Sequence, residues 1–341
     1  MKTVIRLFCL CLVMLCSCVN SSNPKIGLCF TGQGVDISGV ANDFIKRVAP
    51  VAEEYEKIKE QTGLTDDDIL EGSKESLFCK GKVQQALATV QCLILKGINC
   101  LYPNLHFDCV IGQSLGNYTA LFAAGAISLE DLLKFLQLRD ELSTDIARNA
   151  QQSYKMVVVQ GIDFNILEKY VNTKTTFITS KNTKSCFTVA GVDKAVSLLE
   201  DKLKSDMPDI KLIELKVAAP FHTNFMAPLV DELWKNFPTR KNLLIPIISD
   251  ATGLIYYSSD GFDKSWLKKQ LTNPMLWSGA NGMFERIEEQ KLTHIIVVGD
   301  GQGSADMLNE NIPNISAYAV KDIGQLNKVV EEIEAFRKSG L

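Results

Sequence analysis

The segment that most constrains this chain is a G-x-S-x-G pentapeptide at residues 112–116, set between two apolar stretches. Residues 107–111 are typical of a buried strand, and residues 119–124 begin an apolar helix. A serine on so tight a strand-to-helix turn has an exposed hydroxyl, and glycine is needed where the backbone is crowded. The helix that follows offers unpaired N–H groups to an oxygen that develops negative charge. The pattern therefore predicts that Ser114 is a nucleophile.

Length and composition indicate an ordinary globular protein. The chain has 341 residues, of which 46% are hydrophobic and 22% charged. A chain of this length buries roughly three quarters of its unfolded surface, enough for one large core with a satellite. The net charge is −4 and there is no basic run, so we expect no nucleic-acid partner.

Residues 1–22 form a distinct leader. A short cationic start precedes an apolar run at residues 7–16, which is too short to span a bilayer comfortably, and a polar stretch follows. This pattern predicts a secretory signal peptide. The alternatives are a signal anchor that stays attached and a bacterial lipoprotein site at residues 15–18. With the leader removed, we expect no stable membrane insertion.

The cysteines do not form a recognisable disulfide pattern. Four of the ten lie in the leader, and the other six are irregularly spaced. Cys29, Cys92 and Cys109 fall inside apolar segments, where a thiol behaves as a small hydrophobe. An entry signal combined with a reduced domain suggests passage through the secretory route to a reducing organelle.

The N-terminal half reads as alternating strands and helices. We expect a strand at residues 25–30, a glycine turn around Gln33, helices at 42–61 and 82–102, and a helix at 128–150. Ser128 with Asp131 forms a capping-box pattern at the start of the last helix. Arg139 lies on the inward apolar stripe of that helix, and a buried guanidinium requires an anion. That anion is a structural carboxylate or a substrate carboxylate, unless the side chain reaches out to water.

Residues 153–217 have the pattern of short strands and helices that alternate along the chain. We expect strands at 155–160, 175–180, 185–190 and 210–217, with helices at 165–171 and 193–206. The order βαββαβ predicts a ferredoxin-like small subdomain inserted into a catalytic subdomain made of residues 25–152 and 218–341.

The C-terminal part supplies a base for the serine. Of the chain's histidines, His222 sits in a loop after Pro220 and Phe221, and a serine at an elbow needs a base. Taken alone, His222 is better explained by a structural role, and it becomes the candidate base only because of the serine. A later glycine loop at residues 299–304 does not by its spacing justify a nucleotide site.

Several motifs in one order resemble those of the malonyl-CoA:acyl carrier protein transacylases of type II fatty acid synthesis. Residues 30–34 resemble their FPGQG opening, and residues 112–118 resemble their GHSLGEY elbow. Residues 138–139 match their arginine position, 219–222 their histidine loop and 270–274 their Q-L-x-N-P segment. Residues 182–191 and 298–301 match further blocks, so the resemblance covers about residues 25–309.

The resemblance implies a fold and a reaction. The fold is α/β, with an α/β-hydrolase-like large subdomain around a parallel sheet and the inserted ferredoxin-like subdomain. Ser114 would take the malonyl group as an ester, with His222 as base, and a ping-pong reaction would pass it to the phosphopantetheine thiol of the acyl carrier protein. Arg139 would pair with the malonyl carboxylate. No metal or redox cofactor is implied.

Further site residues follow from the resemblance. The backbone carbonyl of Gln270 would hold the second ring N–H of His222. Backbone N–H groups of Leu115 and Asp36 would bind the oxyanion. Substrate binding would fall to Gln33, Gln113 and Phe221, together with Arg139. The phenylalanine resembles the malonyl-selective form of the histidine loop.

The chain departs from the motifs at four positions: Gln113 replaces a histidine, Asn117 a glutamate, Asp36 a glutamine and Asp300 a proline. The two amides still form hydrogen bonds. If only the backbone N–H of Asp36 is used, the replacement is harmless. If its carboxylate lies beside an oxyanion and a malonate, it opposes both charges and reduces activity.

Three functions therefore stand at this point: malonyl transfer, a serine esterase or lipase, and a weakened acyltransferase homologue that binds a carrier protein. We expect a monomer, with Lys184 and Lys211 contacting an acidic carrier protein. The leader points to a plastid such as an apicoplast, with the mitochondrion as the alternative.

Overall fold

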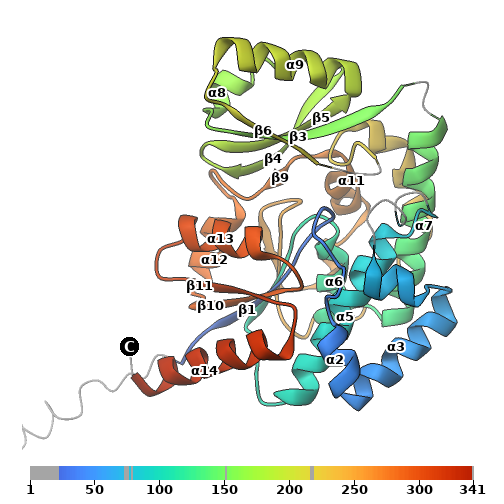
Figure 1. The fold of residues 1–341 in the computed structure, drawn as a ribbon, viewed down its shortest axis with the longest axis vertical. Helices are drawn as coiled ribbons and strands as arrows, with labels where there is room; N and C mark the ends of the chain where they lie inside the picture. The colour runs from blue at the N-terminus through green and yellow to red at the C-terminus, as the bar shows by residue number, and fades with distance from the viewer. Residues whose placement is uncertain (1–22, 73–76, 78–79, 150–151, 216–218, 340–341) are drawn as a thin grey trace, which may run out of the picture.

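The chain folds around two β-sheets, which Figure 1 shows one above the other. This computed structural model describes residues 23–72, 77, 80–149, 152–215 and 219–339. The predicted leader, residues 1–22, lies outside the described residues, as does the predicted subdomain boundary at residues 216–218.

The larger sheet has six strands in the order β11-β10-β1-β2-β7-β8. The first five run parallel and only β8 is antiparallel. All five residues of β1 are buried, as expected for a parallel strand covered on both faces. The strands are β1 (Ile26–Phe30), β2 (Cys109–Gly112), β7 (Ile247–Ser249), β8 (Leu254–Tyr256), β10 (His294–Val298) and β11 (Ser316–Val320).

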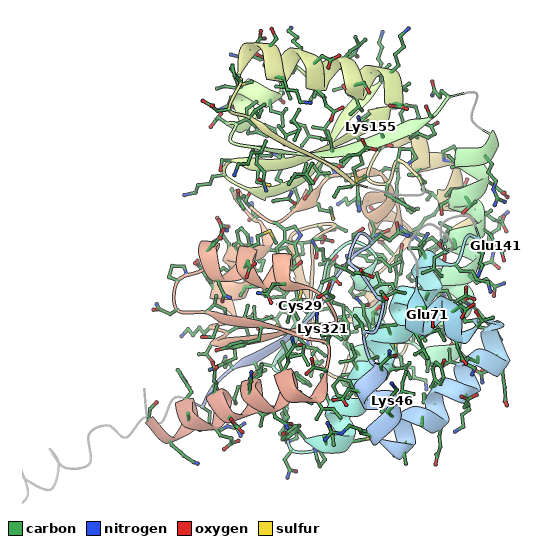
Figure 2. The ribbon with its side chains drawn as sticks, viewed as in Figure 1. Cys29, Lys46, Glu71, Glu141, Lys155 and Lys321 are labelled. Atoms are coloured by element: carbon green, nitrogen blue, oxygen red, sulfur yellow. The ribbon has the colours of Figure 1, made fainter. Side chains whose placement is uncertain are left out.

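Side chains of the central strands alternate between two apolar layers. Leu28 and Phe30 of β1 pack into the larger core, whereas Cys29, whose position Figure 2 shows, packs into the smaller one. The larger core is covered by α2 (Asn42–Arg47), α3 (Ala49–Thr62), α5 (Val83–Leu101), α6 (Gly116–Ala123), α7 (Leu129–Asn149) and α14 (Ile323–Ser339). The smaller core is covered by α12 (Met283–Glu289) and α13 (Gln302–Asn311).

In the large subdomain the helix predicted at residues 42–61 differs from the structure. There the predicted single helix is two, α2 and α3, with Val48 extended between them at φ −121°. Pro50 explains the break, because proline fits the first turn of a helix but cannot continue one. The predicted capping box is present, since the Asp131 N–H donates to Ser128 Oγ over 3.1 Å and Ser128 Oγ donates to the Asp131 carboxylate.

The second sheet has the strand order β6-β3-β5-β4-β9. Its first four strands and two helices follow the ferredoxin-like βαββαβ order, and β9 joins from a later part of the chain, parallel to β4. The elements are β3 (Tyr154–Gln160), α8 (Phe164–Leu167), β4 (Thr176–Thr183), β5 (Cys186–Val192), α9 (Asp193–Asp206), β6 (Lys211–Leu215) and β9 (Met275–Leu276). Helix α8 is shorter than the predicted 165–171. The α/β fold with an inserted ferredoxin-like unit is thus confirmed.

Lys155, which Figure 2 labels, forms ion pairs with a helix and a neighbouring strand of this unit. Its Nζ lies 2.6 Å from the carboxylate of Glu200 in α9 and 3.3 Å from that of Glu214 in β6. The remaining elements are η1 (Asp67–Glu71), η2 (Asn224–Leu229), α10 (Val230–Lys235), η3 (Ser259–Gly261) and α11 (Lys264–Thr272). Across the described ranges, none of the helices combines the length and the apolar character that a membrane crossing needs.

Candidate active site

The strand order brings four loops together at one edge of the large sheet. Strands β10, β1, β2 and β7 are neighbours and parallel, so the loops after them meet where ligands bind in such sheets. The loops after β1, β2 and β7 carry Gln33, Ser114 and Asp250, and Ser304 lies in the first turn of α13, just past the loop after β10. Residues distant in sequence therefore form one site.

Ser114 lies on a sharp turn between β2 and α6, as predicted. Its backbone has φ 50°, a conformation that L residues rarely adopt. The two flanking glycines are needed for close packing. A Cβ on Gly116 would lie 2.0 Å from the carbonyl oxygen of Phe30, and one on Gly112 would lie 2.5 Å from Cα of Asn117. No side chain larger than hydrogen fits at either position.

His222 is the partner of the serine. Its Nε2 lies 2.8 Å from Ser114 Oγ, and its Nδ1 lies 3.2 Å from the backbone carbonyl of Asn273. A carbonyl only accepts hydrogen bonds, so Nδ1 carries the proton and Nε2 is free to accept the serine proton. Burial, with the charge of Arg139 as a second cause, lowers the pKa of His222 to about 3. The imidazole is therefore neutral and ready to act as a base.

The prediction that the Gln270 carbonyl orients the histidine is wrong. Gln270 lies inside α11, whereas Asn273 is the first residue past the helix and has an extended backbone, which turns its carbonyl to the imidazole. Gln270 acts through its side chain instead. Its Nε2 donates to the Ser114 carbonyl over 3.1 Å, and its Oε1 accepts from the Tyr118 hydroxyl over 2.7 Å.

Asp250 is a site residue that sequence reasoning missed. Its carboxylate, fully buried, accepts hydrogen bonds from the Ser114 N–H over 2.8 Å and from the Asn117 side-chain amide over 2.7 Å. Burial raises its pKa to about 7. A signal was present, because Asp250 directly follows the short apolar segment that forms β7, at the edge of the sheet that carries the serine.

Arg139 faces inward, as its place on the apolar stripe predicted. Its side chain is 1% exposed, and the guanidinium carbon lies 4.5 Å from the centre of the Phe221 ring. One terminal nitrogen donates to Gln84 Oε1, while Nε is buried without a partner among the described residues. Within those residues no carboxylate forms an ion pair with it. It lies next to the site rather than among the residues that line the cavity.

A cavity of about 630 Å³ opens over Ser114 and His222 between the two sheets. Its floor comes from the large sheet, and its roof comes from strands of the ferredoxin-like unit, including Met156, Asn182, Cys186 and Leu215. Its side comes from the glycine loop at residues 299–304 and from α13. This loop connects β10 to α13.

The predicted substrate-binding residues line this cavity. Gln33, Gln113 and Phe221 all contribute to its wall. Gln113 Oε1 accepts a hydrogen bond from Ser304 Oγ over 2.9 Å, whereas Nε2 of Gln33 is buried without a partner among the described residues. A buried donor of this kind is available to a substrate oxygen.

The two predicted oxyanion donors lie in different surroundings. Within the described residues the Leu115 N–H, at the start of α6, donates to no protein acceptor. Asp36 is exposed, does not line the cavity, and its carboxylate accepts from the Ser38 N–H over 3.0 Å. The turn after β1 carries Asp36 away from the serine and leaves Gly32 beside it, where a Cβ would lie 2.9 Å from that of Ser114. The carboxylate therefore does not oppose charge in the site.

The sequence resembles that of known proteins over most of its length. The chain is 24% identical over 320 residues to the malonyl CoA-acyl carrier protein transacylase of Bacillus subtilis, covering 91% of this chain and 98% of the relative. No family model matches the chain.

Solved structures share the fold. The malonyl-CoA:acyl carrier protein transacylase of Helicobacter pylori superimposes with a TM-score of 0.80 at 22% identity, covering 91% of this chain and 99% of its own. A chain from the complex of a type II polyketide acyl-carrier protein with its malonyl-transacylase gives a TM-score of 0.81 at 22% identity, covering 90% and 99% of the two chains. The resemblance seen in the motifs is confirmed.

Proposed function

We propose that this relative of the malonyl-CoA:acyl carrier protein transacylases transfers a malonyl group from malonyl-CoA to the phosphopantetheine thiol of an acyl carrier protein, as a supplier of type II fatty acid synthesis. The proposal starts from the relationship in sequence and fold. The geometry of the site then selects an acyl group that carries a negative charge.

The observation that carries the proposal is the unpaired guanidinium of Arg139. It is buried next to the Ser114–His222 pair, and no carboxylate among the described residues lies within ion-pair distance of it. An isolated charge in such a place is unfavourable, whereas a substrate carboxylate would supply both charge and hydrogen-bond acceptors. Malonyl has this carboxylate, and acetyl does not.

The first half-reaction forms an ester on the serine. Nε2 of His222 takes the proton of Ser114 as Oγ attacks the thioester carbonyl, and the tetrahedral intermediate then expels the CoA thiolate, which receives that proton. In the second half-reaction, His222 takes the proton of the phosphopantetheine thiol as the sulfur attacks the ester carbonyl. The tetrahedral intermediate then expels the Ser114 oxygen, which receives the proton back from His222. No atom changes its oxidation state, so these steps need no redox cofactor, and we propose that no metal takes part either.

For the oxyanion we propose two backbone donors, the N–H groups of Leu115 and Gln33. The Leu115 N–H has no protein acceptor within the described residues, at the positive end of α6. Gln33 follows Gly32, whose Cα packs against Ser114, and it lines the cavity. It replaces Asp36 in this role.

For carrier-protein contact we propose Lys184. This exposed residue lies between Thr183 and Ser185, both of which line the cavity, so a cation there is placed to receive an acidic carrier whose prosthetic arm enters. Lys211, exposed on β6, is the second contact that we propose.

A mass-spectrometric assay tests the proposed function. The protein is mixed with malonyl-CoA and a reduced carrier protein that bears phosphopantetheine, and all products are weighed. We expect carrier that gains one malonyl group, together with a malonyl adduct on the enzyme. Free malonate without carrier malonylation would instead show a hydrolase, and carrier binding with neither product would show a weakened homologue.

We also propose that residues 1–22 direct the protein to a plastid through the secretory route, as their composition indicates. Imaging a fluorescent protein fused to residues 1–30 tests this. Mitochondrial fluorescence would contradict it.

A further inference from the structure

A buried carboxylate lies behind the nucleophile, where none of the steps above uses it. Asp250 has both carboxylate oxygens engaged, Oδ2 with the Ser114 N–H at 2.8 Å and Oδ1 with the Asn117 side-chain amide at 2.7 Å. Unlike the acid of a full Ser-His-Asp triad, it does not contact the histidine, whose Nδ1 faces the Asn273 carbonyl. The acid of this site binds the backbone of the serine.

The same network fixes the other side of the serine. The Asn117 amide that donates to Asp250 also donates to the Ser114 carbonyl over 2.9 Å, and its Oδ1 accepts from Ser249 Oγ over 2.6 Å. Trp266 Nε1 donates to Ser249 Oγ over 3.1 Å. Asp250 therefore holds the Ser114 N–H from outside the turn, and Asn117, three residues after the serine, holds its carbonyl.

These hydrogen bonds stabilise the unusual backbone conformation of Ser114, which has φ 50°. A non-glycine residue in that region stays there only where its surroundings over-determine it. Two donors point at the two oxygens of Asp250, and only a carboxylate accepts both. An asparagine would turn its own NH₂ toward one of them.

We propose that Asp250 is a positioning residue, which holds the Ser114 hydroxyl in line with His222 through its two carboxylate oxygens and the Asn117 amide. The inference rests on the proposed acyl transfer, since it concerns the same serine. The raised pKa of Asp250 agrees with the proposal. Burial of a carboxylate that has no cationic partner among the described residues is unfavourable, and such groups are often found at functional sites.

The test compares Asp250→Asn with the parent in two reactions of Ser114. One is the rate of acylation by malonyl-CoA, and the other is the rate of covalent labelling by a fluorophosphonate probe, which needs the positioned serine but no malonyl recognition. We expect both rate constants to fall about tenfold to a hundredfold, as for a misplaced reacting group, with the KM for malonyl-CoA unchanged. Rates within about twofold of the parent's would overturn the proposal.

Asp68→Asn is the matched control. Asp68 is also a buried carboxylate, and it accepts from the Thr65 N–H and from Lys80 and Lys82, far from the site in a different set of contacts. We expect it to lower the melting temperature and leave both rate constants of the folded enzyme unchanged. An equal loss of rate in Asp68→Asn would show that general destabilisation, and not positioning, explains Asp250→Asn.

An exchange of the two partners gives a second criterion. In the double variant Asn117→Asp/Asp250→Asn the carboxylate and the amide exchange positions. The side-chain amide at position 250 can then donate to the carboxylate at position 117, which restores one hydrogen bond between the two residues. We expect the double variant to label with the probe at least about fivefold faster than the product of the two single effects predicts. Simple multiplication of the single effects would contradict the pairing.

The probe also separates this inference from the proposed function, because it labels the serine without malonyl recognition. A parent enzyme that reacts with the probe but forms no malonyl-enzyme would refute the proposed function and leave the positioning role standing.

Discussion

The Nδ1 atom of His222 lies 3.2 Å from the backbone carbonyl of Asn273, so a neutral acceptor holds the imidazole whose Nε2 meets Ser114. A backbone carbonyl fixes the tautomer as an aspartate would, but it does not neutralise the imidazolium that forms during acylation. A buried neutral histidine is suited to a substrate that brings its own negative charge.

Replacement of Ser114 by alanine should abolish the acyl-enzyme. The oxygen that attacks the thioester is then absent, and no other group among the described residues lies within hydrogen-bond distance of His222 Nε2. Intact-mass spectrometry after incubation with malonyl-CoA measures the adduct. A malonyl adduct on the folded variant would place the nucleophile elsewhere.

Replacement of Arg139 by alanine should reduce malonyl transfer about ten- to a hundredfold, because a charge-assisted pair contributes about 1.5–3 kcal/mol. Transfer of acetyl should rise at the same time, since a neutral acyl group no longer has to leave the guanidinium unpaired. The measurement is kcat/KM for each acyl-CoA in competition.

Arg240→Ala is the control for the Arg139 experiment. The Arg240 guanidinium also lies over aromatic rings, 5.2 Å from the centre of Phe237, and its Nε is buried without a partner among the described residues. It should lose packing but keep the ratio of malonyl to acetyl transfer. Equal malonyl turnover by Arg139→Ala would refute the carboxylate pairing.

Replacement of Gln270 by alanine should slow acylation and destabilise the protein by about 1–3 kcal/mol, because it leaves the buried Tyr118 hydroxyl without its acceptor. Chemical denaturation measures the stability, and probe labelling measures the serine. Gln290→Ala, which removes an exposed contact to Tyr257, should change neither. If Gln270 mattered only through its backbone carbonyl, its truncation would have no effect.

The stability of the protein should depend on pH through His222. Its folded pKa of about 3 lies below the ordinary value of 6.5, so between these values the unfolded chain binds a proton that the folded chain does not. This term therefore destabilises the protein as the pH falls through that window. In His222→Gln the term is absent, so the urea midpoint should fall less between pH 7 and pH 5 than in the parent. An equal fall in both proteins would contradict the lowered pKa.

The sequence predicted the elements whose causes are local. Glycines 112 and 116, the alternation of apolar segments and the Ser128–Asp131 capping pair each act over a few residues, and the structure has the elbow, the βαββαβ unit and the capped helix that they indicate. The inward position of Arg139 followed from helical periodicity for the same reason.

The errors arose where contacts join distant segments. Asp36 and Gln270 were assigned by alignment to motifs, but the direction of a turn and the end of a helix move the functional atoms to other residues. Asp250 has no motif of its own, and it becomes part of the site only because β7 pairs with β2.

By itself, the sequence determined which serine lies on the sharp strand-to-helix turn, because that turn is encoded by neighbours in the chain. Only the tertiary structure decided what surrounds that serine: the Asn273 carbonyl on the histidine, the Asp250 carboxylate on the serine N–H, and the guanidinium of Arg139 without a carboxylate among the described residues. These relations depend on strand order and on helix ends, which bring together groups more than a hundred positions apart. A one-dimensional pattern records neither.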